Sequence, residues 1–194
     1  MKTKRTLLIF LAGLLVFPYI IEAQVAYKGK TNKMSVLGTS TLHDWESDVT
    51  QVECKGSVTL ENNKLADVKD VQVKIPVTSI KSTKGKIMDE KTWEAFNSDK
   101  NPNIQYRLLS AKISGSGPEY NVVASGNLTM AGATKPIEFN AKAKVLGNGD
   151  VQITGSHKLN MIDYKMDPPR AMMGTIKVGE EVTVKFDITL TPDK

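Results

Sequence analysis

The side chains best able to do chemistry together lie in the run His43-Asp44-Trp45, with Ser40 shortly before it. Serine, histidine and aspartate are the parts of a hydrolytic triad, in which the histidine takes the serine proton. Neighbouring residues of an extended segment point to opposite faces, however, and no strand-turn-helix elbow surrounds Ser40. We therefore expect a strand start, with Trp45 plugging one end of the fold and Asp44 or Ser40 bonding to local backbone. The sequence leaves the role of His43 open.

His157 is the second candidate, because the alternation of its segment places it on an apolar face between Gly155 and Leu159. An inward histidine is either a hydrogen-bonded core residue or, in a ligand cavity, a polar anchor for a head group. The chain has two histidines and one cysteine without close ligand spacing, so no metal site is predicted. It also lacks a phosphate loop and a dinucleotide fingerprint, and we expect no cofactor.

Sulfur-containing residues form the third group. Cys54 is the only cysteine and lies in phase with Val52 and Val58, which indicates a buried thiol and no internal disulfide. Met166, Met172 and Met173 fall in an irregular stretch of the sequence. Flexible thioethers suit the lining for a variable lipid tail and ordinary gap filling equally well, so both readings stay open.

Residues 1–23 have the pattern of a signal peptide. Three basic residues occur within the first five positions, the apolar run Leu7–Ile21 follows, and Ala23 offers a small residue for cleavage. The apolar run is short for a membrane span, and no second run exists. We therefore expect an exported, soluble protein that is periplasmic or secreted.

Cleavage after residue 23 would leave residues 24–194 as one domain with a substantial core. It would remove three of the 26 basic and one of the 21 acidic residues, so the formal net charge falls from +5 to +3. No basic run of five residues occurs, and nucleic-acid binding is not expected. The sequence leaves a monomer and a homodimer open.

Strands must position these candidate residues, because apolar and polar residues alternate along most of the chain. The clearest pair is Tyr120–Met130 and Ile137–Val145, joined by a connection that contains Gly132, Thr134 and Pro136. Other alternating segments are Val25–Tyr27, Met34–Leu37, Val52–Leu60, Val71–Ile80, Ile104–Ile113, Val151–Met161 and Val182–Leu190. About eight or nine strands favour an all-β, up-and-down antiparallel barrel, because closure removes exposed sheet edges.

One segment breaks the alternation. Residues 81–101 are polar, and the spacing of Ile87, Met88 and Ala95 suits a short helix that Asn101-Pro102 would close. Its apolar side, with Trp93 and Phe96, would either cover the core or form a lid over a cavity.

Two small residues bear on whether the barrel is hollow. Ala141 and Ala143 lie on the dry face of their strand, between Phe139 and Val145. A solid core would normally fill such positions, whereas a barrel with a ligand cavity can leave them small. Variation in packing is the simpler explanation of two alanines taken alone, so the residues alone predict an exported barrel, hollow or solid.

Five segments in this order carry a resemblance to a known family: Thr41–Trp45 (T-L-H-D-W), S-I-K-S from Ser79, Asn101–Tyr106 (N-P-N-I-Q-Y), Gly126–Pro136 (G-N-L-T-M-A-G-A-T-K-P) and Ile162–Tyr164 (I-D-Y). Through them the chain resembles the YceI-like polyisoprenoid-binding family of small exported bacterial proteins. The resemblance implies a lipocalin-like barrel of eight antiparallel strands with one short helical insert. It also implies an apolar tunnel for a polyprenyl chain, and association with isoprenoid quinones or related amphiphiles. The His43-Asp44 wording departs from the commonest family form, so family contacts are not transferred there.

We therefore expect non-enzymatic binding of a polyisoprenoid or other amphiphilic lipid, for carriage or storage in the cell envelope, with transient membrane contact. The expected ligand-binding residues are Phe139, Ala141, Ala143, Val145, Leu159 and Met161, with His157 as polar anchor and Trp93 and Phe96 at the helical cover. The alternative is a structural, interaction or stress-response module of the envelope with a solid barrel. A lipid-modifying enzyme is a third option, for which His157 is the available reactive group.

Overall fold

The computed structural model describes residues 24–193. The predicted signal peptide, residues 1–23, lies outside the described residues, as does Lys194.

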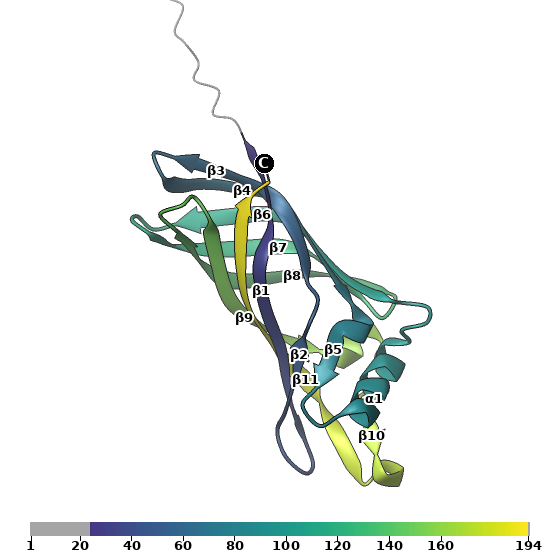
Figure 1. Ribbon diagram of the computed structural model, residues 1–194. Coiled ribbons are helices and arrows are strands. Elements are labelled where there is room, and N and C mark those ends of the chain that lie inside the picture. The colour runs from purple at the N-terminus through teal and green to yellow at the C-terminus, as the bar shows by residue number, and fades with distance from the viewer. Residues whose placement is uncertain (1–23, 194) are drawn as a thin grey trace, which may run out of the picture.

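Eight antiparallel strands form a closed barrel (Figure 1), as the sequence predicted. Their order around the wall is β1-β3-β4-β6-β7-β8-β9-β11, and β11 pairs with β1 to close it. The bounds are β1 Val25–Ser40, β3 Glu53–Glu61, β4 Lys64–Pro76, β6 Asn103–Ser114, β7 Glu119–Met130, β8 Ala133–Val145, β9 Val151–Asn160 and β11 Ile176–Pro192. The lipocalin-like, all-β architecture with one short helix is therefore confirmed.

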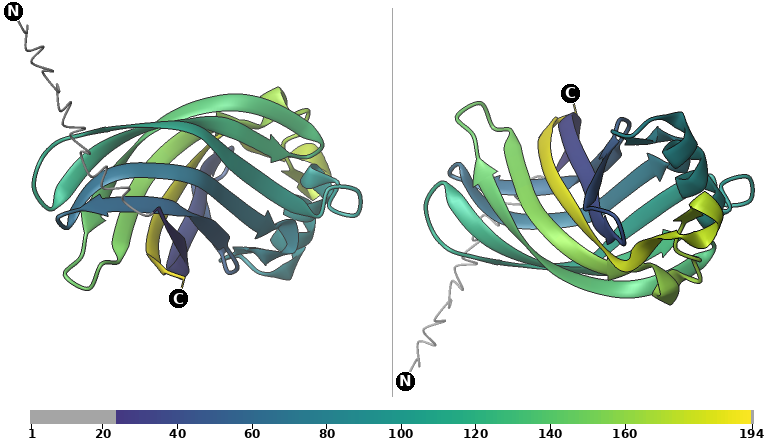
Figure 2. Two further views of the ribbon diagram at one scale, coloured as in Figure 1. Left: turned by 90° about the horizontal axis from the view of Figure 1, so that it is seen from above. Right: turned by 90° about the horizontal axis from the view of Figure 1, so that it is seen from below.

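The smaller elements gather at one end of the barrel, which we call the α1 end (Figure 1). They are β2 Trp45–Val49, β5 Ile80–Ser82, α1 Lys86–Phe96, β10 Arg170–Ala171 and the 3-10 turns η1 Val77–Ser79, η2 Met161–Tyr164 and η3 Met172–Gly174. β2 pairs with β1 and β5, and β10 pairs with β11. The β3–β4 and β8–β9 turns lie at the opposite end, as the views from above and below in Figure 2 also show.

Several strand boundaries differ from the prediction. The segments around Val25 and Leu37 belong to one long strand, and β11 begins at Ile176, inside the stretch expected to be irregular. The strand predicted to reach Ile80 ends at Pro76, where the buried Ser79 hydroxyl donates a hydrogen bond of 2.7 Å to the Pro76 carbonyl. That local bond supports a turn that alternation does not reveal.

The β7–β8 connection is also tighter than expected. Only Ala131 and Gly132 lie between the strands, and both have positive φ angles, of 49° and 77°. Such angles suit two-residue hairpin turns. Pro136 lies inside β8 because β8 pairs with β9 only from Ala141 onward, so the missing proline N–H removes no bond of that ladder.

The helix is confirmed, but it ends before the predicted stop at Asn101-Pro102. Asn97 adopts the left-handed conformation after Phe96, and the Asn101 amide donates to the Phe96 carbonyl at 3.2 Å. At the other end of α1, the buried Asp89 carboxylate accepts a hydrogen bond of 2.6 Å from the Ser82 backbone N–H, which ties α1 to β5. Within residues 24–193, no helix is long and apolar enough to cross a membrane.

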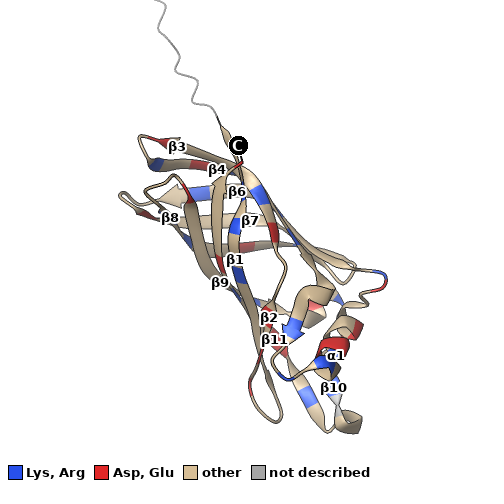
Figure 3. Cartoon of the chain, in the orientation of Figure 1, with Lys and Arg blue, Asp and Glu red and all other residues tan. Residues whose placement is uncertain are grey.

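Two apolar clusters lie along the inner side of the barrel wall. One lies at the α1 end and includes Ile75, Phe96 and Met161, and the other lies at the opposite end and includes Val58, Val151 and Leu190. Figure 3 shows that acidic and basic positions are intermixed along the chain. The interior that these clusters surround is the part of the fold that concerns function.

Candidate functional site

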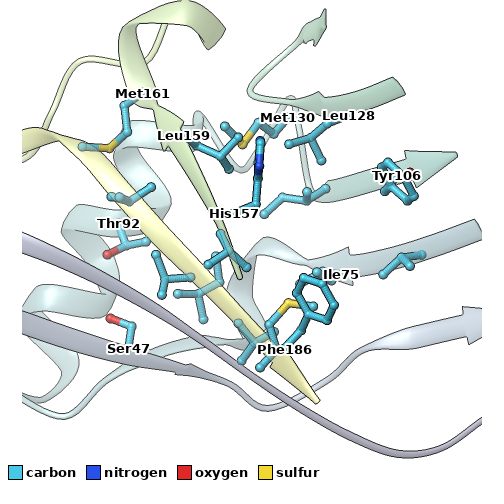
Figure 4. Close-up of a pocket in the computed structure, with 18 of the residues that line it drawn as sticks. Ser47, Ile75, Thr92, Tyr106, Leu128, Met130, His157, Leu159, Met161 and Phe186 are labelled. Atoms are coloured by element: carbon cyan, nitrogen blue, oxygen red, sulfur yellow. The ribbon is translucent and has the colours of Figure 1, made fainter. Parts of the chain in front are cut away.

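A cavity of about 420 Å³ runs along the barrel interior (Figure 4). All eight barrel strands and α1 contribute to its lining, and most of the lining side chains are aliphatic or aromatic. Inward positions at a spacing of two supply these side chains, because successive residues of a strand face opposite sides of the wall. The barrel is therefore hollow.

The cavity reaches solvent at the α1 end, where Leu42, His43 and Lys84 are exposed and also line it. We call this opening the mouth. The β1–β2 loop and the β10–β11 hairpin meet there, because the Thr41 backbone N–H donates to the Lys177 carbonyl at 2.9 Å. The start of α1 forms the third side through Lys84 and Met88.

The opposite end is closed by packed side chains. Val151 and Leu190 have no exposed surface. The Tyr27 hydroxyl donates to the Gly149 carbonyl at 2.9 Å, and Lys30 bonds the Asp150 carboxylate at 2.9 Å. The hydrogen bond from Lys30, supported by bonds from Thr191 and Asn148, lowers the pKa of Asp150 to about 2. The cavity is therefore open at the mouth and closed at the opposite end.

Four rings meet midway along the cavity, and we call Tyr106, Phe139, His157 and Phe186 the waist. The Phe139 ring centroid lies 5.6 Å from that of Tyr106, 5.8 Å from His157 and 5.6 Å from Phe186. These are ordinary distances for aromatic contact. Figure 4 shows the Tyr106, His157 and Phe186 side chains among those that line the cavity.

Two glycines make room for the waist rings. A Cβ atom on Gly126 would lie 2.6 Å from the Tyr106 ring, and one on Gly155 would lie 2.5 Å from the Phe186 ring. Real Cβ atoms essentially never come that close to another heavy atom. The absence of a side chain at these positions is therefore what allows the two rings to lie against the backbone there.

The titratable side chains inside the cavity are held in their neutral forms. Burial lowers the pKa of His157 and raises the pKa of Tyr106 to about 12 and that of Cys54 to about 11. A thiol with so high a pKa is a weak nucleophile at neutral pH. Among the described residues, no group of three or more His, Cys, Asp or Glu side chains could hold a metal ion. The arrangement is suited to holding an apolar molecule.

Most of the predicted ligand-binding residues line this cavity: Phe96, Phe139, Ala141, His157, Leu159 and Met161. Ala143 and Val145 do not, because they belong to the packed cluster at the closed end, where Ala143 is only 1% exposed. Alternation indicates whether a side chain points into the barrel or towards solvent, but not where it lies along the barrel axis. Ligand contact by these residues stays a prediction.

Trp93 also lies away from the lining. Its indole N–H donates to the Ile80 carbonyl at 3.4 Å, and the Lys81 ammonium lies 4.3 Å from the centre of its ring. Trp93 thus attaches α1 to β5, whereas Phe96 on the same helix faces the cavity. The helix covers the core and borders the cavity at once, so both sequence interpretations hold in part.

Local hydrogen bonds hold the polar run from Ser40 to Trp45 in its conformation near the mouth. The Ser40 hydroxyl donates to the His43 carbonyl at 2.7 Å and accepts from the Leu42 and His43 backbone N–H groups at 3.2 Å. This confirms backbone bonding by Ser40. Trp45 lines the cavity at its mouth, with its indole N–H on the Thr39 carbonyl at 2.9 Å.

The three methionines of the late segment separate. Met166 is buried and lines the cavity, whereas Met172 and Met173 are exposed on η3. Neither lining nor gap filling describes the last two, so both sequence interpretations were wrong for them. The turn that exposes them uses left-handed backbone at two non-glycine residues, which has no reliable sequence signal.

Tyr106 and Phe186 were missed as site residues. Both are in phase with the apolar positions of their strands, so their inward orientation was readable from the sequence. Their position at the waist could not be predicted from the sequence. It depends on the register of β6 with β7 and on the register of β11 with β9.

Comparison with known proteins places the chain in context. The YceI-like domain matches residues 22–190. Among solved structures, Burkholderia cenocepacia BcnA is 18% identical, with 82% of this chain and 96% of that chain covered and a TM-score of 0.66. A polyisoprenoid binding domain from Saccharophagus degradans, implicated in plant cell wall breakdown, is 11% identical, with 87% and 99% covered and a TM-score of 0.68.

The Campylobacter jejuni YCEI protein is 16% identical, with 75% of this chain and 85% of that chain covered and a TM-score of 0.54. At these identities the three structures establish a shared fold. Comparison with curated protein sequences finds no match.

Proposed function

Because this chain belongs to the YceI-like domain family, we propose that it binds a polyisoprenoid or another amphiphilic lipid, of the isoprenoid-quinone kind, inside the barrel. It catalyses no reaction and serves carriage or storage in the cell envelope, as a periplasmic or secreted monomer or homodimer. The observation that carries the proposal is the apolar cavity of about 420 Å³ that opens at the mouth. The likeness to the polyisoprenoid binding domain from Saccharophagus degradans supports it.

The size and chemistry of the cavity suit such a ligand. Ligand cavities commonly measure roughly 300–1,000 Å³. Each buried methylene equivalent contributes roughly 0.8 kcal/mol, so one five-carbon isoprene unit contributes about 3–4 kcal/mol before costs. A micromolar dissociation constant corresponds to about 8 kcal/mol. A few isoprene units therefore suffice once the cost of ordering the chain is subtracted.

A water-insoluble ligand can be loaded by contact with a membrane, and several exposed apolar side chains lie on the segments around the mouth. Leu42 is 66% exposed, Ile87 74% and Met172 73%, and Met173 is fully exposed. These residues come from the β1–β2 loop, the start of α1 and η3, the three segments that meet around the mouth. Exposed apolar side chains gathered at one place mark an interaction surface. The mouth is accordingly the part of the protein that touches the bilayer transiently.

The primary test is mass spectrometry of an organic extract from mature protein, purified without detergent from an exporting bacterial host. We expect a polyprenyl or related lipid in stoichiometric amount. A clean extract, together with no uptake when quinone or polyprenol is offered in excess, would contradict lipid binding. It would favour the alternative of an envelope module that acts through its surface.

Ala141→Phe provides the matched variant. Ala141 is buried, lines the cavity and lies opposite Gly155 on the neighbouring strand, so a phenyl ring there would occupy the ligand space. We expect bound lipid to fall at least about tenfold, which corresponds to about 1.4 kcal/mol. Lys142→Phe is the control, because it introduces a phenylalanine on the outer face of β8. This variant should retain the lipid. Equal lipid content in the two folded variants would show that the ligand binds elsewhere.

A further inference from the structure

The lining of the cavity ends at one level of the barrel. On β8 the last lining residue is Ala141, and the next inward residue, Ala143, is packed and 1% exposed. Five other strands change from lining to packed in the same way: Val68 to Leu65, Ala111 to Ile113, Val122 to Tyr120, Ile153 to Val151 and Ile188 to Leu190. Tyr120 pairs with Ala143 and Val151 with Leu190, so the packed residues lie beside one another across the barrel. We call these six packed residues the floor.

Tyr120 is the largest side chain of the floor and is 5% exposed. Its hydroxyl accepts a buried hydrogen bond of 3.1 Å from the backbone N–H of Leu65 on β4. Since β6 lies between β4 and β7 in the wall, the Tyr120 side chain reaches across the inner side of β6. Its two ends are thus held on different strands, and the ring closes the cavity on this side.

The lining that follows the waist towards the floor is aliphatic. It consists of Val68, Val71, Leu108, Ala111, Val122, Ala141, Ile153 and Ile188. The Tyr106 hydroxyl at the waist makes no hydrogen bond to a described residue, but it is shielded from solvent, so the cavity does not reach it. A polar group of a ligand would lose its hydration next to the floor without gaining a partner. This part of the cavity therefore suits the apolar end of a lipid.

The depth of the cavity limits the length of that apolar chain. β11 lines it from Val178 near the mouth to Ile188 above the floor. Ten residues of a barrel strand with the usual tilt extend about 25 Å along the barrel axis. An extended isoprene unit has four chain bonds of about 1.5 Å and is roughly 5 Å long. The cavity therefore has the depth of about five isoprene units.

We infer that the floor, with Tyr120 as its principal residue, sets the maximum length of the prenyl chain that the barrel holds. The fitting class is a prenyl lipid of about five isoprene units or fewer, bound with its apolar end against Tyr120. A longer chain would leave its remaining units in water outside the mouth, which is unfavourable. The inference rests on the proposed function, because it requires a prenyl lipid in the cavity.

The test offers lipid-free mature protein an excess of vesicles that carry an equimolar mixture of all-trans prenols with three to eight isoprene units. Mass spectrometry of the separated protein gives the uptake of each prenol relative to its content in the vesicles. The proteins are the wild type, Tyr120→Ala, Tyr120→Phe and Val122→Phe. Tyr120→Ala removes the ring and deepens the cavity, whereas Tyr120→Phe is the matched control that keeps the ring. Val122→Phe raises the floor, because Val122 is the next inward residue towards the mouth.

In the wild type we expect uptake of prenols up to about five units and at least about tenfold less of each longer prenol, because every further unit exchanges the bilayer for water. Tyr120→Ala should raise this limit by about one unit, since the phenol group that it removes is larger than one isoprene unit. The limit should be unchanged in Tyr120→Phe and lower in Val122→Phe.

The same limit in the wild type, Tyr120→Ala and Val122→Phe would overturn the inference and leave lipid binding intact. Uptake by the wild type without any length limit would do the same. If circular dichroism shows that Tyr120→Ala does not fold, an unchanged limit in Val122→Phe is sufficient to overturn it. A wild type that takes up no prenol would reject the proposed function as well.

Discussion

At the scale of single residues, Cys54, Tyr106 and His157 share one property, which is that burial shifts each of them towards its neutral form. All three line the cavity away from the mouth. A neutral interior favours uncharged ligands, because a charged group would lose hydration without compensation. The same burial also makes the protein sensitive to acid at one position.

His157 should make the folded state less stable at low pH. Its folded pKa is lowered, so the unfolded chain binds more protons once the pH falls below the unfolded value of about 6.5. Wild-type stability therefore decreases as pH falls through that value, until both states are protonated. We expect His157→Gln to lack this loss, so that the difference in unfolding free energy moves in favour of the variant between about pH 7.5 and about pH 5.

Urea denaturation at the two pH values measures this difference. Asp150 does not interfere, because its contribution changes below the range, between its unfolded pKa of 3.8 and its folded pKa of about 2, and is the same in both proteins. An identical pH dependence for the wild type and His157→Gln would mean that water solvates the imidazole in the cavity and that burial does not control its protonation.

At the scale of elements, the close approach of β6 and β7 depends on Gly126. A Cβ atom there would lie 2.5 Å from the Arg107 carbonyl oxygen as well as 2.6 Å from the Tyr106 ring. The carbonyl belongs to a paired strand and cannot move without breaking the ladder. Overpacking of this kind costs about 1–3 kcal/mol, and we expect Gly126→Ala to lose that amount of stability.

Gly147→Ala is the matched control, because a Cβ atom on Gly147 meets no atom within 4 Å. Chemical denaturation should show a lower midpoint for Gly126→Ala and an unchanged one for Gly147→Ala. Similar midpoints for the two variants would mean that the β6–β7 pair relaxes easily and that the Tyr106 ring is not held in place.

The element scale also shows how far the sequence predicts this fold. Alternation at a spacing of two identified the strands and their inward faces, because that period follows directly from strand geometry. It could not identify the left-handed turn at Ala131, nor the end of β4 at Pro76, because both depend on local backbone bonds and angles. Boundaries were therefore less predictable than strand identities.

The sequence predicted which side chains of the candidate site face the barrel interior, but not how far along the barrel axis they lie. Ala141 and Ala143 have the same pattern in the sequence, yet one lines the cavity and the other is packed at the closed end. The distinction arises from how strands distant in sequence stagger against each other around the barrel. The unpaired hydroxyl of Tyr106 was beyond prediction for the same reason, because it depends on neighbours from other strands.

At the scale of the whole molecule, the two ends of the barrel differ in chemistry. The closed end is sealed by buried apolar residues and by the ion pair of Lys30 with Asp150. The mouth carries exposed apolar side chains on three segments that are hydrogen-bonded or packed together. This difference between the two ends fits a protein that approaches a lipid surface with its mouth first.

Membrane contact at the mouth predicts a specific loss on mutation. Leu42→Ser combined with Met173→Ser removes two exposed apolar tips, each of which should contribute about 1 kcal/mol on partial burial in the bilayer interface. We therefore expect binding to phosphatidylethanolamine–phosphatidylglycerol vesicles to weaken more than about tenfold in a flotation assay. Folding should be unaffected, because both side chains are exposed.

Leu109→Ser is the control, because Leu109 is 65% exposed on β6, matching the 66% of Leu42, but lies outside the cavity lining. It should bind vesicles as the wild type does. If Leu109→Ser weakened vesicle binding as much as the double variant, general surface hydrophobicity would explain the contact. If neither variant changed it, the mouth would not be the membrane-facing surface, and ligand loading would require a partner protein that delivers the lipid.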